Sequence, residues 1–174
     1  MRYKKILVAI DQSSQSDVVF EQALDLATKE HACLMLFHSL PVKTPGSGAY
    51  GDMFGRELIN FSGEMQAALR QEKEEAREWL TSYCQRATAR GVPTEWDLKV
   101  GDAGEAIRAL AEAWDADLVV LGRRGRRGFA EIVLGSVSNY VVHHAPCCVL
   151  VVQGINPTAH ETAEALIQAN HEEY

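Results

Sequence analysis

Short apolar runs alternate with segments of helical periodicity along the whole chain. Four of the runs are apolar almost throughout, which is typical of parallel strands that are buried on both faces of a sheet. The third run alternates apolar and polar residues, so we expect it at a less covered edge. The predicted strands are Lys5–Ile10, Cys33–His38, Thr94–Val100, Asp117–Leu121 and Cys147–Val152.

Four helices are predicted between these strands. Ser13 or Ser14 is expected to cap the first. The second covers about residues 57–90 and ends at Gly91, after a long glycine-rich and proline-rich loop at 41–56. Its predicted apolar stripe is Phe61, Met65, Leu69, Ala76, Leu80 and Tyr83. The third follows a capping box, Asp102-Ala-Gly-Glu105, and the fourth covers about 136–144.

This regular alternation predicts one α/β domain, a doubly wound parallel sheet with helices on both faces. We assign residues 1–154 to that domain and 155–174 to a C-terminal extension. The extension carries a capping box at Thr158–Glu161 and apolar residues at helical spacing, which predicts a short amphipathic helix. A frayed tail is the alternative.

Charge and composition exclude some classes of function. The net charge of −7 argues against a general binder of nucleic acid or of anionic membranes. No apolar run approaches the roughly 20 residues that span a bilayer, and the first residues do not form a signal peptide, so we expect a cytoplasmic protein. The four cysteines lack zinc-site spacing and are expected to be buried free thiols.

The clearest chemical signal follows the fourth predicted strand. Gly122-Arg-Arg-Gly125 is separated by nine residues from Gly135-Ser-Val-Ser138, which opens a helix. Glycines allow backbone N–H groups to approach an oxyanion, and a helix start adds unsatisfied N–H groups and a positive dipole end. Ser136 and Ser138 add hydroxyl donors. This pattern predicts a phosphate site.

Two further features bear on that site. Asp11 follows the first strand, at the carboxyl edge where parallel sheets bind ligands, although it could instead cap the first helix. Arg123, Arg124, Arg126 and Arg127 either grip phosphates or form a solvated charged run.

Taken together, these residues resemble the universal stress protein family. The resemblance rests on Lys5–Asp11, Val100-Gly-Asp102, the stretch Asp117–Ser138 and Ala145–Val152. It implies a five-stranded sheet of order 3-2-1-4-5, a homodimer formed partly through strand five (147–152), and ATP as ligand. It further implies that Asp11 contacts the ribose and helps to hold Mg²⁺ or Mn²⁺ beside the phosphates. The implied nucleotide-binding residues are Ala9, Ile10, Asp11, Ser39, Leu121, Gly122, Arg123, Gly125, Arg126, Gly128, Gly135, Ser136, Val137 and Ser138.

The predicted function is a nucleotide-dependent stress-response regulator with at most slow ATP hydrolysis. Binding is expected to order the 41–56 loop and the arginine-rich loop and to change the surface offered to an unknown protein partner. The alternatives are a slow ATPase or phosphotransferase, an AMP or cyclic AMP sensor using the same pocket, and a dimeric interaction module that binds no nucleotide.

Overall fold

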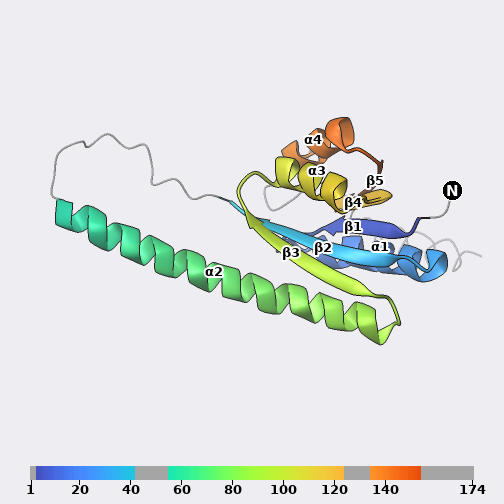
Figure 1. The fold of residues 1–174 in the computed structure, drawn as a ribbon, viewed down its shortest axis with the longest axis horizontal. Helices are drawn as coiled ribbons and strands as arrows, with labels where there is room; N and C mark the ends of the chain where they lie inside the picture. Colours follow the sequence, from blue (N-terminus) through green and yellow to red (C-terminus); the bar gives the residue numbers. More distant parts are fainter. Residues whose placement is uncertain (1–2, 42–54, 124–133, 154–174) are drawn as a thin grey trace, which may run out of the picture.

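Strands and helices alternate along the described part of the chain, from Lys5 to Val152 (Figure 1). The computed structural model describes residues 3–41, 55–123 and 134–153, with their side chains except those of 55–62 and 64. The predicted alternation is confirmed, with most boundaries shifted by one or two residues. The elements are β1 (Lys5–Ala9), α1 (Ser16–Glu30), β2 (Cys33–Leu40), α2 (Gly55–Ala89), β3 (Thr94–Val100), α3 (Ala103–Ala113), β4 (Leu118–Gly122), α4 (Ser136–His144) and β5 (Cys148–Val152).

The five strands form one parallel sheet in the order β3-β2-β1-β4-β5, which confirms the expected topology. β1 lies at its centre, where Leu7 pairs with Met35 of β2 and with Val119 of β4. The chain builds outward from β1 to β3 and then returns to place β4 on the other side of β1. β3 therefore lies at an edge, as its alternating pattern predicted.

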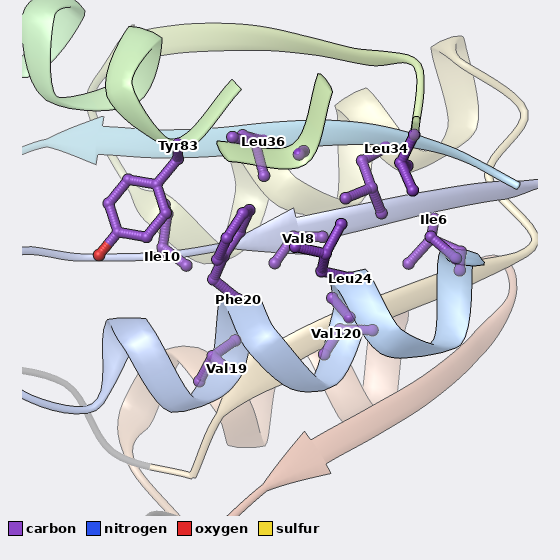
Figure 2. Close-up of a cluster of buried hydrophobic side chains, with 14 of the residues drawn as sticks. Ile6, Val8, Ile10, Val19, Phe20, Leu24, Leu34, Leu36, Tyr83 and Val120 are labelled. Atoms are coloured by element: carbon purple, nitrogen blue, oxygen red, sulfur yellow. The ribbon is translucent and has the colours of Figure 1, made fainter. Parts of the chain in front are cut away.

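The sheet is covered on both faces, which explains why β1 is apolar at every position after Lys5. Successive side chains of a strand point to opposite faces. Ile6 and Val8 enter a core formed with α1 and α2, whereas Leu7 enters a second core formed with α3 and α4. Figure 2 shows Phe20 and Leu24 of α1 directed toward the strands in the first of these cores.

Among the side chains of the long helix α2 that the structure describes, the buried ones lie in its second half. Its buried side chains in that half include Leu80 and Tyr83, whereas Met65 and Leu69 of the predicted stripe stay partly exposed. Figure 1 shows the reason, because the first part of α2 runs past the end of the sheet. Gly91, with φ of 75°, follows the helix end as predicted. Among the described residues, no helix is long and apolar enough to cross a membrane.

The start of α1 differs from the prediction. The N-cap is Gln15, without a side-chain hydrogen bond, and neither Ser13 nor Ser14 caps the helix. Ser16, only 3% exposed, explains the difference. Its hydroxyl donates to the backbone carbonyl of Asp11 and so closes a tight turn over residues 11–16. The helix begins only after this turn.

The cysteines also differ from the prediction. All four are free, but Cys33, Cys84 and Cys147 are only partly buried and Cys148 is exposed. Cys148 lies on β5, an edge strand with one side uncovered. Burial raises the pKa of the Cys84 thiol to about 11 and also raises that of Cys147. Both therefore stay protonated near neutral pH.

Candidate functional site

The candidate site lies at the carboxyl ends of β1 and β4, where the direction of chain building reverses. Ala9 pairs with Leu121. Asp11 and Arg123 each follow by two residues, so the pairing brings the predicted residues of both strands to one edge of the sheet. Ligands of open parallel sheets bind at this reversal point. Ile10 and Leu121, next to these positions, are 5% and 3% exposed and belong to the cores on opposite faces of the sheet.

Arg123 is fixed by its backbone at the end of β4. Its N–H donates to the carbonyl of Val152 at 2.9 Å, which ties it to the end of β5. Its own carbonyl accepts two hydrogen bonds, from the N–H of Gly135 at 2.9 Å and from the hydroxyl of Ser138 at 2.8 Å. The chain segment that carries Gly125, Arg126 and Gly128 starts and ends at this junction, and these three residues lie outside the described part of the chain.

The first turn of α4 presents backbone donors without a side-chain cap. The N-cap, Gly135, has extended φ and ψ of −64° and 161°, and the turn contains no acidic residue. The first N–H groups of a helix have no acceptor within the helix, and the dipole adds positive potential. Ser136 and Val137 are exposed here. This arrangement suits an anion such as a phosphate group.

Ser138 is placed differently from Ser136. It is 2% exposed, and its hydroxyl lies 2.8 Å from the carbonyl of Arg123 and 3.0 Å from that of Gly135. The predicted hydroxyl donor is thus directed into the protein in this structure. Its backbone N–H remains in the first turn of α4.

Asp11 organises the turn that leads from β1 into α1. Its Oδ1 accepts hydrogen bonds from the N–H of Ser13 and from the hydroxyl of Ser16, both at 3.2 Å. It does not cap α1, because Gln15 occupies that position. These contacts hold a half-buried carboxylate at the edge of the sheet beside the end of β4.

Ser39 lies one strand further along the same edge, on β2. Its hydroxyl donates to the carbonyl of Gly101 at 3.0 Å, and the N–H of Gly101 donates to Leu40 at 2.9 Å. The φ of Gly101 is 143°, which L side chains rarely adopt. Ser39 therefore joins the end of β2 to the turn after β3, on the opposite side of β1 from α4.

Two features of this edge were not singled out in the sequence. His38 is 3% exposed, and its Nδ1 donates to the carbonyl of Ile10 at 2.9 Å, which supports the end of β1 from β2. Tyr140 of α4 packs on Gly104 of α3, and its hydroxyl donates to Glu105. A polar residue in an apolar strand was the available signal for His38, whereas no local pattern marks a contact between helices.

The Tyr140 contact shifts the pKa values of both of its partners. The hydrogen bond from Tyr140 holds the pKa of Glu105 below its usual value, with a further contribution from Arg108. The same bond raises the pKa of Tyr140. Within the described residues, no group of three or more histidine, cysteine or acidic side chains could hold a metal ion.

Comparison with known proteins gives a consistent result. Residues 2–153 match the sequence profile of the universal stress protein family. The universal stress protein Sll1388 of Synechocystis sp. is 49% identical over 153 residues, which cover 88% of this chain and 99% of that protein.

Solved structures agree in fold. The universal stress protein UspA from Lactobacillus plantarum has a TM-score of 0.72 at 25% identity, covering 87% of this chain and 99% of that one. A universal stress protein from Archaeoglobus fulgidus in complex with dAMP has a TM-score of 0.57 at 25% identity, with 87% and 98% covered. A universal stress protein in complex with cAMP has a TM-score of 0.58 at 24% identity, with 89% and 100% covered. By its sequence and its fold, this chain belongs to the universal stress protein family.

Proposed function

We propose that this protein is a cytoplasmic, ATP-binding stress-response regulator that acts as a nucleotide-dependent switch. The observation that carries the proposal is the uncapped start of α4, joined to the end of β4 beside Asp11. The dAMP and cAMP complexes of the structural relatives support an adenine nucleotide as the ligand.

The proposed nucleotide lies along the carboxyl edge of the sheet. Its phosphates accept hydrogen bonds from backbone N–H groups at the start of α4 and from the exposed hydroxyl of Ser136. Asp11 contacts the ribose, and the adenine lies toward Ala9 and Ser39. The remaining proposed contacts are Ile10, Leu121, Gly122, Arg123, Gly125, Arg126, Gly128, Gly135, Val137 and, through its backbone N–H, Ser138.

Mg²⁺ or Mn²⁺ is proposed to accompany the nucleotide. When bound, it would neutralise charge on the phosphates. The carboxylate of Asp11 is a suitable oxygen donor, already oriented by Ser13 and Ser16. Mg²⁺ is usually held by one or two carboxylates together with substrate phosphates, which fits a site with Asp11 as the protein ligand. Hydrolysis is proposed to be slow at most, because Ser136 and Val137, which are exposed in the first turn of α4, are not general bases.

The two edges of the sheet support a homodimer through β5. The β3 edge carries Glu95, Asp97 and Lys99, and charged residues discourage edge-to-edge pairing. β5 carries no charge and exposes Leu150 at 39%. Leu150→Lys should therefore dissociate the dimer, whereas Val100→Lys, at a β3 position 38% exposed, should not. Sedimentation velocity distinguishes the two outcomes.

The first test of the nucleotide is to denature the purified protein and identify any released small molecule by mass spectrometry. Near-stoichiometric ATP or ADP supports the proposal. Calorimetric titration with ATP, ADP, AMP and cAMP then ranks the ligands, with and without Mg²⁺. Failure of every nucleotide to bind would refute the proposal and leave the interaction module as the better description.

A second candidate function is an AMP or cyclic AMP sensor that uses the same site. The specific observation in its favour is that the two structural relatives are complexes with monophosphates, dAMP and cAMP. Tighter binding of AMP or cAMP than of ATP in the same titration would favour the sensor over the ATP switch.

A further inference from the structure

Ser138 connects α4 to the end of β4 through a side chain. Its hydroxyl is 2.8 Å from the carbonyl of Arg123 and 3.0 Å from that of Gly135. At 2% exposure, the side chain lies within the protein and faces these two carbonyls. A hydroxyl has one hydrogen to donate, so the shorter contact, to Arg123, is the better candidate for the main bond.

The backbone of Arg123 connects the end of β4 to β5 and to the start of α4. Its carbonyl accepts from Ser138 and from the N–H of Gly135, while the N–H of Arg123 donates to Val152 of β5. Arg123 is thereby held from both sides of its backbone. Gly135 is the N-cap of α4, so the same bonds attach the start of α4 to the end of β4.

We propose that Ser138 is a positioning residue of the nucleotide site, whose hydroxyl holds Arg123 and Gly135 in place and does not contact the ligand. This inference rests on the proposed function. It assigns different roles to the two serines of the Gly135–Ser138 motif. Ser136, exposed at the start of α4, donates to the phosphate, whereas Ser138 fixes the backbone that presents the N–H groups.

The test compares Ser138→Ala, Ser138→Thr and Ser136→Ala with the wild-type chain. ATP affinity is measured by calorimetry, and the opening of the Gly135 N–H bond is measured by amide hydrogen exchange without nucleotide. Loss of one net hydrogen bond corresponds to a change of roughly five- to tenfold. We expect Ser138→Ala to weaken ATP binding by about that factor and to speed exchange at Gly135.

The other two variants give the matched controls. Ser136→Ala should weaken ATP binding and leave exchange at Gly135 as in the wild type. Ser138→Thr keeps the hydroxyl and should restore both readouts, and circular dichroism confirms that each variant is folded.

Three results would overturn the inference. Weaker ATP binding by Ser138→Ala with normal exchange at Gly135 would make Ser138 a direct ligand. Faster exchange with unchanged affinity would make its role structural only. If the wild-type chain binds no nucleotide, the proposed function fails and this inference fails with it, whereas in the first two results the wild-type chain still binds ATP and the proposed function stands.

Discussion

The helices α3 and α4 begin at the same edge of the sheet, yet their N-termini differ in capping and in charge. Both N-caps have extended backbones, Asp102 with φ and ψ of −69° and 123° and Gly135 with −64° and 161°. The side chain of Asp102 accepts from the N–H of Glu105 at 2.9 Å, and Glu105 adds a second negative charge to the first turn. α4 has neither a side-chain cap nor an acidic residue there.

This difference separates a structural helix start from one suited to a ligand. In α3, the carboxylate of Asp102 accepts a hydrogen bond from one N–H of the first turn, and the negative charges of Asp102 and Glu105 complement the helix dipole. In α4, the corresponding groups are available to an external anion. The two helices are nevertheless in contact, because the ring of Tyr140 packs on Gly104 and its hydroxyl bonds to Glu105. The Tyr140 contact therefore joins two helices whose N-termini differ in charge, acidic in α3 and without an acidic residue in α4.

The largest expected effect comes from separating the two helices. A Cβ at position 104 would lie 2.7 Å from Cδ1 and 3.0 Å from Cγ of Tyr140. These are atoms at the base of a ring that is anchored on α4, so the helices must shift. Gly104→Ala should lower the free energy of unfolding by about 1–3 kcal/mol, as overpacking does. Urea denaturation measures this change.

Gly63→Ala is the matched control for that substitution. Gly63 is in α2, and a Cβ there meets nothing within 4 Å. Alanine is the better helix former by about 1 kcal/mol, so this variant should be as stable as the wild type or more stable. Equal destabilisation of both variants would show that the contact with Tyr140 is not the cause.

The second prediction gives α4 the acidic start that α3 has. Ser136→Asp places a carboxylate in the first turn, where it competes with an incoming phosphate. Nucleotide affinity should fall at least about tenfold, while the ligand-free protein gains about 0.3–1 kcal/mol from the helix dipole. Calorimetry and thermal melting measure the two effects. Unchanged ATP affinity would place the phosphates away from α4.

The third prediction removes the cap of α3. Asp102→Ala should cost about 1 kcal/mol of stability, because the N–H of Glu105 loses its acceptor. Asp102→Asn keeps an acceptor and should be close to the wild type. Nucleotide affinity should be the same in both variants, and a loss in either would bring α3 into the binding site.

The smallest predicted effect is a pH dependence. The bond from Tyr140 lowers the pKa of Glu105 from its ordinary 4.5. A group with a lowered folded pKa contributes stability above its unfolded pKa, and this is lost as the pH falls through the folded value. In Tyr140→Phe, the melting temperature should therefore change less steeply between about pH 5 and pH 3. An identical slope would show that the bond does not hold the charge of Glu105 in solution.

The difference between α3 and α4 was partly readable in the sequence. The capping box at Asp102–Glu105 was predicted, and its Asp102 bond is confirmed. The glycine at 135 and the absence of acidic residues after it were equally visible. Ser13 and Ser14 show the limit of this reasoning, because they had the right residue type, yet a buried Ser16 moved the cap to Gln15.

Local pattern determined the elements, the parallel sheet, the edge position of β3 and the stretch that begins α4. These properties depend on periodicity and on the residue types of a single segment. Tertiary structure alone decided that Ser138 is buried while Ser136 is exposed, that Tyr140 packs on Gly104, and that Met65 stays partly exposed. Each of these depends on which distant segment packs against the residue, and the residue pattern of a single segment does not identify that partner.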